Sequence, residues 1–282
     1  MKRVRKMLAC LVGIGILSGM FCGCGSGSGN AAGLQDGVAR PINEIKDSGY
    51  IRIGVYKDNK PLGYLDENGE YEGYDVRIAK QMAKDLGVEV QLVPIEFGGD
   101  ATVLEEGTAD VVLGNYKDME EPGQKVTTAM PYMMASLAVI SPNKDGVMGG
   151  NEVNNKVILV VQGSVADHYL GSHYKEASMI RLGSLHEVLD GIEGGLGDAA
   201  CVDTLQAASW LLNHKDFTMG FVIPGTSMQI TPAVHPDNGE VAKWVNEEMR
   251  NLQSEGYLDG LYDEILQPVV GGQLNKDEVM IK

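Results

Sequence analysis

Residues 75–94, DVRIAKQMAKDLGVEVQLVP, predict a helix followed directly by a strand. Asp75 is a residue type that favours the first, capping position of a helix, and Gly87 is typical of a helix end. The β-branched run over 88–94 then indicates a strand. The apolar side chains that share one face of the expected helix are Val76, Ala79, Ala83 and Leu86.

The same alternation of elements extends from this stretch in both directions. Apolar residues alternate over 51–56, which predicts a strand before the helix. A short helix over 100–106 and a buried strand over 110–115 follow it. The resulting β-α-β-α-β order is typical of an α/β fold, in which helices connect the strands of one sheet.

The middle of the chain repeats this order. Ser184 is well placed to cap one of the expected helices there. The expected strands lie at 156–161, 179–182 and 199–202, with helices at 163–170 and 184–192 and, later, 205–212. Extended chain at 217–223, a strand at 228–234 and helices at 240–255 and 257–266 complete the chain.

Two similar α/β units with elements left over at the end predict a two-lobed protein whose chain passes twice between the lobes. We expect hinge strands near Val139–Pro142 and Gly225–Thr231. Small ligands bind in the cleft of such open α/β arrangements. The expected divisions are a first lobe over 41–139, a second lobe over 140–228, a return to the first lobe over 229–268 and a tail over 269–282.

The N-terminus predicts export. Four basic residues precede an apolar run that ends at Phe21, which is the pattern of a secretory signal and is too short for a membrane span. The segment resembles a bacterial lipobox, in which the new N-terminal cysteine is acylated. Cys24 follows the small Gly23, so we expect a signal peptide over 1–23, lipidation at Cys24 and a Gly/Ser-rich tether over 24–40. Cys22 is the competing cysteine, and an ordinary secretory peptide is the alternative.

The charge of the chain argues against a nucleic-acid partner. Its formal net charge is −16, and removal of residues 1–23, with four basic and no acidic residues, changes this to −20. Such a surface repels phosphate backbones.

Cysteine and histidine usage gives no sign of a disulfide framework, a metal site or a cofactor. Cys10 and Cys22 leave with the signal, Cys24 is the expected acylation site, and Cys201 stands alone in an apolar run. The five histidines lack the spacing of metal ligands.

Several short motifs, in order, carry a family resemblance over about residues 40 to 268. They are Ser48–Val55, Pro61–Gly69, Glu72–Val76, Leu104–Asp110, Met130–Tyr132, Val161–Ser164 and Leu196–Asp203. On these the chain resembles the extracellular solute-binding proteins of family 3. The resemblance implies the type II periplasmic-binding-protein fold, with two lobes that close over a small ligand.

The resemblance also implies the function. Such proteins capture a polar solute, here an amino acid or related amine, outside the cell and deliver it to a membrane permease of an ABC importer. We expect a binding protein rather than an enzyme, because no nucleophile with a neighbouring base and no phosphate loop is visible. The alternatives are a sensor or adhesion lipoprotein on the same fold and, less favoured, a cleft enzyme such as a dehydratase.

Three residues of the expected second lobe match ligand positions of the family. Asp203 stands where relatives hold the ammonium of an amino acid, although a plain helix cap is the alternative. Gly163 and Ser164 match a helix-opening loop whose N–H groups hold a carboxylate, with helix capping again the alternative.

The first lobe departs from the family pattern. The arginine that binds the carboxylate in relatives is replaced by Pro122, which cannot donate a hydrogen bond. Lys117, just past the strand that ends at Asn115, is a candidate for the missing charge, and a solvated loop lysine is the alternative.

The expected aromatic lining is also altered. Asn59 replaces the usual aromatic residue, and Tyr56 stands at a position that is often acidic in the family. Tyr116 and Phe97 match other cleft-lining positions, and Asn115, the last residue of the expected strand, directly precedes Tyr116. These aromatic rings are suited to stacking on a planar or cationic ligand, with core packing as the alternative for Phe97.

Overall fold

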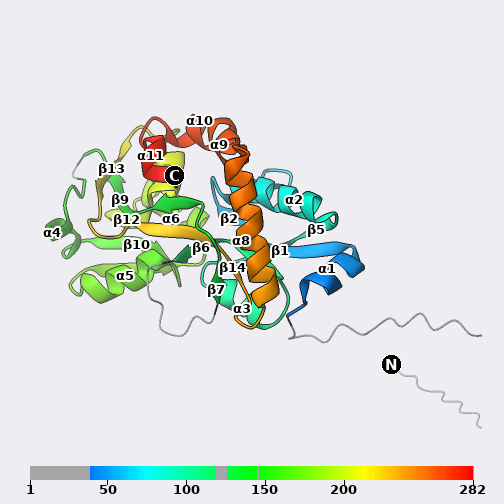
Figure 1. Ribbon diagram of the computed structural model, residues 1–282. Helices are drawn as coiled ribbons and strands as arrows, with labels where there is room; N and C mark the ends of the chain where they lie inside the picture. The colour runs from blue at the N-terminus through cyan, green and yellow to red at the C-terminus, as the bar shows by residue number, and fades with distance from the viewer. Residues whose placement is uncertain (1–38, 118–125, 145, 282) are drawn as a thin grey trace, which may run out of the picture. The chain divides into compact units, whose positions relative to one another are not determined.

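The computed structural model describes residues 39–117, 126–144 and 146–281 (Figure 1). The expected signal peptide, Cys24, nearly all of the tether and Pro122 lie outside these residues. All described residues belong to one compact unit, Gln35–Lys282. No helix among the described residues is both long and apolar enough to cross a membrane.

The first sheet contains the stretch from which the fold was predicted. Its strands follow the order β5-β1-β6-β14-β7, and β8 pairs with β14. β1 is parallel to β5 and β6, whereas β14 is antiparallel to β6. The bounds are β1 Tyr50–Tyr56, β5 Glu89–Ile95, β6 Val111–Lys117, β7 Thr127–Thr128, β8 Met133–Ala135 and β14 Met228–Val234. Its helices are α1 Ile42–Ser48, α2 Tyr74–Leu86, α3 Asp100–Glu105 and α8 Gly239–Ser254.

The second sheet repeats this design, with the strand order β11-β10-β12-β9-β13. β10 is parallel to β11 and β12, and β9 is antiparallel to β12 and β13. The bounds are β9 Leu137–Pro142, β10 Val157–Val161, β11 Ser178–Leu182, β12 Ala199–Asp203 and β13 Phe217–Val222. Its helices are α4 Gly150–Val153, α5 Val165–His173, α6 Leu185–Glu193 and α7 Thr204–Leu211.

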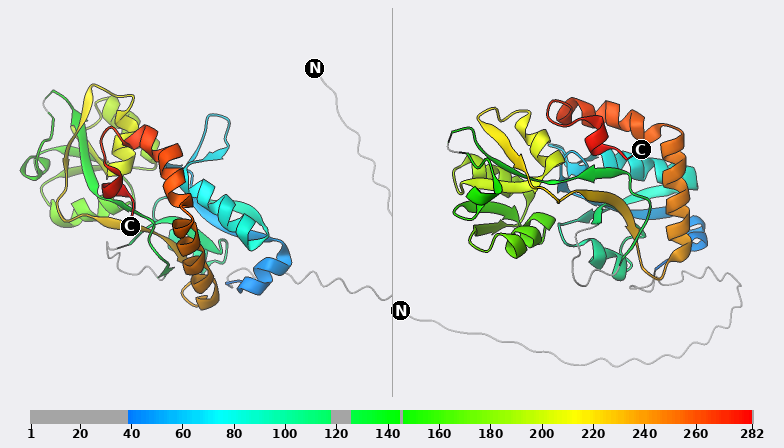
Figure 2. Two further views of the ribbon diagram at one scale, coloured as in Figure 1. Left: turned by 45° about the horizontal axis from the view of Figure 1, so that its top comes forward. Right: turned by 60° about the vertical axis from the view of Figure 1, so that its left-hand side comes forward.

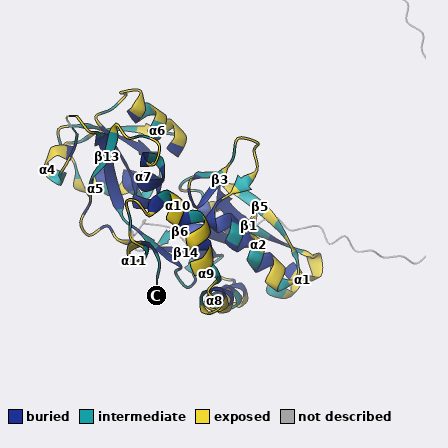
Figure 3. Ribbon diagram, turned by 90° about the horizontal axis from the view of Figure 1, so that it is seen from above, coloured by how far each residue is buried: buried dark blue, intermediate teal, exposed yellow. Residues whose placement is uncertain are grey.

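We call the two sheets, with the helices that pack on them, the first and the second lobe. Burial follows the alternation of apolar residues that the sequence displays. Figure 3 shows the strands largely buried and the outer sides of helices such as α1 and α6 exposed. In α6, the buried residues are Leu185, Val188 and Ile192, which recur at helical spacing, and Ser184 caps the helix as expected by accepting a hydrogen bond from the amide of Glu187.

The chain passes between the lobes twice. The first passage lies at Ser136, between β8 and β9, and the second lies between β13 and β14. The right-hand view of Figure 2 shows these passages, one green and one yellow-brown, side by side. The first passage is held by Thr204, whose amide donates to the Ser136 carbonyl at 2.8 Å, and by Thr226, whose hydroxyl accepts from the Leu137 amide at 3.0 Å.

Two expected boundaries differ from the structure. The first lobe was expected to extend to residue 139, but Leu137 already pairs with Asp203 in the second sheet. The expected hinge at Val139–Pro142 therefore lies inside β9. The antiparallel pairing of β9 with β12 begins at Leu137, directly after the passage at Ser136. Within the expected tail over 269–282, residues 269–270 and 276–279 are helical.

The C-terminal segment packs on the two lobes. α9 (Tyr257–Leu261) leads into a π-helical turn, η1 (Tyr262–Leu266), and then into α10 (Gln267–Val270), which contacts α7. After α11 (Lys276–Val279), Met280 forms an isolated bridge with Met133.

The start of α2 also differs from the sequence prediction. The helix begins at Tyr74 after Gly73, so Asp75 lies in the first turn and does not cap it. The Asp75 side chain is fully buried, and its Oδ1 accepts a hydrogen bond of 2.7 Å from the hydroxyl of Tyr132. A tertiary contact from a distant segment therefore replaces the local role that the sequence indicated.

A small antiparallel sheet lies between β1 and α2. It consists of β2 (Asp58–Asn59), β3 (Gly63–Leu65) and β4 (Tyr71–Glu72). Gly73 allows this small sheet to lie close to the start of α2. The φ angle at Gly73 is +116°, and an added Cβ would lie only 2.2 Å from the carbonyl oxygen of Leu62.

Candidate functional site

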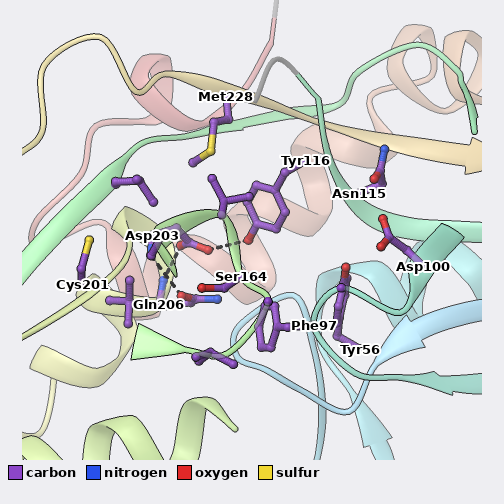
Figure 4. Close-up of a pocket in the computed structure, with 17 residues that line it drawn as sticks. Tyr56, Phe97, Asp100, Asn115, Tyr116, Ser164, Cys201, Asp203, Gln206 and Met228 are labelled. Carbon is purple, nitrogen blue, oxygen red and sulfur yellow. Dashed lines mark hydrogen bonds between the residues drawn. The ribbon is translucent and has the colours of Figure 1, made fainter. Parts of the chain in front are cut away.

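A cavity lies between the two lobes (Figure 4). Its volume is about 650 Å³, including the part that is open to solvent. The first lobe contributes Tyr56, Phe97, Gly98, Asp100, Asn115 and Tyr116 to the lining. The second lobe and the two passages contribute Val161, Gly163, Ser164, Val165, Ala166, Cys201, Val202, Asp203, Gln206, Leu137 and Met228.

Asp203 is the central polar residue of this cavity. It ends β12 and caps α7, and its Oδ1 accepts hydrogen bonds of 2.8 Å from the amides of both Leu205 and Gln206. Its Oδ2 accepts a hydrogen bond of 2.5 Å from the hydroxyl of Tyr116, which belongs to the other lobe. Asp203 therefore caps a helix and also lines the cavity.

Burial determines the electrostatics of Asp203. The residue is 4% exposed, and burial raises the pKa of its carboxyl group, although the hydrogen bonds from Tyr116 and from the two amides oppose this rise. No ion pair to Asp203 is present among the described residues. A cationic group in the cavity would compensate for this buried negative charge.

Gly163 and Ser164 lie at the start of α5 and also line the cavity. Ser164 caps the helix, with its hydroxyl oxygen 3.3 Å from the donating amide of Asp167. The amide of Gly163 donates to Oδ2 of Asp167 at 3.2 Å. Ser164 therefore caps the helix, which was the alternative that the sequence left open. Val165 and Ala166, the first two residues of α5, also line the cavity.

The aromatic lining comes from the first lobe. Tyr56 and Phe97 stack with their ring centroids 5.0 Å apart, and both line the cavity. Burial raises the pKa of Tyr116 well above its usual value, and the nearby Asp203 carboxylate adds to this effect. All three rings line the cavity, and Tyr116 is neutral at pH 7.

The sequence also predicted Asn115, Asn59 and Lys117 as ligand-binding residues, and only Asn115 is seen to line the cavity. Asn115 lines the cavity, and its side-chain nitrogen donates a hydrogen bond of 3.4 Å to the hydroxyl of Thr231. Asn59 does not line it: the residue is 0% exposed, and its Oδ1 accepts a hydrogen bond of 2.8 Å from Gln206. Lys117 ends β6 with its backbone paired to Gln229, and its side chain lies outside the described part of the structure.

The sequence did not single out Gln206, which connects several of these groups. Its side-chain oxygen accepts from the amide of Asp203 at 3.0 Å, and its side-chain nitrogen donates to Asn59. The sequence did contain a sign of the contact between Gln206 and Asp203, because a glutamine three positions after an aspartate is the spacing of a capping box.

The apolar part of the lining comes mainly from the second lobe and the passages. Val161, Cys201 and Val202 belong to buried strands, and Leu137 and Met228 lie where the chain passes between lobes. Burial raises the pKa of the Cys201 thiol to about 12, so this side chain is a neutral apolar group at pH 7. No cluster of side chains suited to a metal ion is present in the described ranges.

Comparison with known proteins supports the same fold. The glutamine-binding protein of an ABC transporter from Bacillus subtilis is 25% identical over 251 residues, which cover 86% of this chain and 90% of that protein. A crystal structure of a solute receptor for L-cysteine from Neisseria gonorrhoeae superposes with a TM-score of 0.81 and 29% identity, covering 86% of this chain and all of the other.

A cysteine-binding protein from Campylobacter jejuni superposes equally well, with a TM-score of 0.81, 29% identity and coverage of 86% of this chain and 98% of that one. The two-lobed α/β fold that the sequence predicted is confirmed by these structures. The family model for bacterial extracellular solute-binding proteins, family 3, matches residues 51–268. The chain therefore belongs to the bacterial extracellular solute-binding proteins, family 3.

Proposed function

We propose that this protein is the amino-acid-binding component of an ABC importer, and that it holds the ammonium group of its ligand on Asp203. The buried carboxylate of Asp203, which lines the cavity and has no ion pair among the described residues, is the observation that carries this proposal. A hydrogen bond between an ammonium and a carboxylate is charge-assisted, and it is strongest where water is excluded. Similar proteins are named for binding glutamine and L-cysteine.

The start of α5 is the proposed site for the carboxylate of the ligand. Val165 and Ala166 carry the first two amides of this helix, and both residues line the cavity. The N–H groups at the start of a helix point outward along its axis and favour an anion. The loop of Gly163 and Ser164 brings these amides to the cavity, and the side chain of Lys117 is the further candidate for a positive charge.

The apolar wall favours an uncharged ligand side chain. Leu137, Val161, Cys201 and Met228 offer no acceptor for a guanidinium group. Burial of such a group against them would leave its donors unpaired, at a cost of at least about 1–3 kcal/mol. We therefore expect the part of the ligand that lies against this wall to be uncharged.

Ligand capture proceeds by closure of the lobes. Asp203 and α5 belong to the second lobe, whereas Tyr56, Phe97 and Tyr116 belong to the first. A ligand that contacts both groups makes all of its contacts only in the closed form, so its binding shifts the population towards that form.

We also propose that the signal peptide is cleaved before Cys24 and that this cysteine is acylated, so that the protein is held at the outer face of the membrane. Labelling of cells with a palmitate analogue tests this. Cys24→Ser should abolish incorporation of the label and Cys22→Ser should not, whereas the reverse result would move the site to Cys22.

Binding of amino acids is tested by thermal unfolding of the full-length protein with L-cysteine, L-cystine, L-glutamine and L-arginine. A ligand at 100 times its dissociation constant stabilises the folded protein by about 2.7 kcal/mol, which shifts the melting temperature clearly. Recovery of the ligand unchanged after incubation is expected of a binding protein. If none of these amino acids shifts the melting temperature, the proposal is wrong, and conversion of a ligand would indicate an enzyme.

A further inference from the structure

The small sheet of the first lobe contacts the second lobe outside the cavity. Asp58, the first residue of β2, accepts a hydrogen bond of 2.9 Å through Oδ2 from the amide of His186, in the first turn of α6. The next residue, Asn59, accepts a hydrogen bond of 2.8 Å from Gln206 in the first turn of α7. Two consecutive residues of one lobe therefore contact the starts of two helices of the other.

The contact of Asp58 completes the cap of α6. The hydroxyl of Ser184 accepts from the amide of Glu187 at 3.2 Å, and this leaves the amide of His186 for an acceptor from elsewhere. Asp58 supplies that acceptor together with a negative charge, which is favourable at the positive end of a helix. The contact exists only while the lobes are together.

The contact of Asn59 leads to the ligand site. Gln206, to which Asn59 is bonded, accepts from the amide of Asp203 at 3.0 Å. The position of β2 against the second lobe is therefore connected, through one side chain, to the residue that carries the proposed ammonium site.

We propose that Asp58 is a positioning residue that holds the lobes closed and thereby sets the affinity for every ligand without selecting among them. Asp58 does not line the cavity, so it makes no contact that distinguishes one ligand from another. The effect on affinity rests on the proposed binding function, whereas the effect on closure does not.

The link between closure and affinity is thermodynamic. When only the closed form binds tightly, the apparent dissociation constant equals the intrinsic constant divided by the closed fraction. A contact made only in the closed form raises that fraction, and it does so by the same factor for all ligands. Loss of the contact should therefore weaken all of them equally.

The experiment compares the unaltered full-length protein with Asp58→Ala, Asp58→Asn and Ser184→Ala. Ser184→Ala is the matched control, because it removes one cap of the same helix but touches only its own lobe. The measurements are the dissociation constants for L-cysteine, L-glutamine and L-arginine by calorimetry, and the radius of gyration of the ligand-free protein by X-ray scattering.

We expect Asp58→Ala to weaken each amino acid that binds by one common factor, between about threefold and thirtyfold, which is the range for a charge at a partly buried helix end. It should also increase the radius of gyration. Asp58→Asn keeps an acceptor and should have a smaller effect, and Ser184→Ala should leave both quantities unchanged.

Three results would overturn the proposal. They are an unchanged radius of gyration and unchanged affinities in Asp58→Ala, a loss confined to one ligand, or an equal loss in Ser184→Ala, which would indicate helix stability alone. If no amino acid binds the unaltered protein, the proposed function fails, and the radius of gyration still decides whether Asp58 holds the lobes together.

Discussion

The hydroxyl of Tyr116 donates a hydrogen bond of 2.5 Å to Oδ2 of Asp203, from one lobe of the protein to the other. This bond favours the ionised form of a carboxyl group whose pKa burial raises. Asp203 must be ionised to hold an ammonium group, so Tyr116 supports the proposed site through the charge of its neighbour.

Tyr116→Phe should therefore change the pH dependence of ligand binding. Without the hydroxyl, the pKa of Asp203 rises further, so the carboxylate takes up a proton at a higher pH. As the pH is lowered, affinity should be lost earlier in the variant than in the unaltered protein. Calorimetric titration of the best-binding amino acid between pH 5 and pH 8, with Tyr64→Phe on β3 as a control, measures this. Superimposable pH profiles would rule out this role for Tyr116.

Burial of Asp75 should make the free energy of unfolding fall as the pH rises, which is the reverse of the usual effect of a carboxyl group. Its Oδ2 is buried with no hydrogen-bond partner among the described residues, and burial raises its pKa to about 7. Between about pH 4 and pH 7 the folded protein therefore binds a proton that the unfolded chain has lost. The contribution of Asp75 to the free energy of unfolding should fall by about 1.4 kcal/mol per pH unit over this range as the pH rises.

Asp75→Asn should abolish this contribution. Urea unfolding of the variant and the unaltered protein at several pH values from 4.5 to 7.5 measures it, with the exposed Asp47→Asn as a control. The difference in unfolding free energy should grow in favour of Asp75→Asn as the pH rises. A constant difference would mean that Asp75 has an ordinary pKa.

Asp110 should have the opposite dependence. Burial opposes its ionisation, but hydrogen bonds from Arg40 and Arg52 outweigh burial and lower its pKa. The ion pairs are formed fully above about pH 4 and are lost as the pH falls through the lowered pKa. Asp110→Asn leaves two arginines without their partner and should cost about 3–5 kcal/mol in urea unfolding at pH 7. A loss below about 1 kcal/mol would show that the cluster contributes little.

Gly73 should tolerate no side chain. Gly73→Ala would place a Cβ 2.2 Å from the carbonyl oxygen of Leu62 at φ of +116°, so the small sheet must shift, and we expect a loss of more than about 2 kcal/mol of stability. Gly69→Ala is a matched control, because φ at Gly69 is also positive and its Cβ would meet no atom within 4 Å. Its cost should be near 1 kcal/mol. Equal losses in urea unfolding would contradict the steric argument.

The helices and strands were largely predictable because their signals are local. Apolar alternation predicted the strand at 51–56, and the structure has β1 at Tyr50–Tyr56. Ser184 was expected to cap a helix and does so. The prediction for Asp75 was wrong because the hydroxyl that binds it belongs to Tyr132, in a segment that no local pattern connects to α2.

The site was predictable only to the level of residue types. A family motif pointed to Asp203, and the structure also gives it the capping role that the residue type indicated. The position of Asn59 could not be predicted, because the partner that draws it away from the cavity, Gln206, belongs to the other lobe. The apolar wall was missed for a related reason, since buried strand residues carry no local sign that they face a cavity.

The most direct test of the account is the affinity of Asp203→Asn for the amino acid that gives the largest thermal shift. Asparagine also caps helices well, so the start of α7 should stay intact while the negative charge is removed. The account predicts that calorimetry will show binding weakened by tenfold to a hundredfold, the loss expected for a charge-assisted hydrogen bond of about 1.5–3 kcal/mol. Unchanged affinity in a folded Asp203→Asn protein would contradict it.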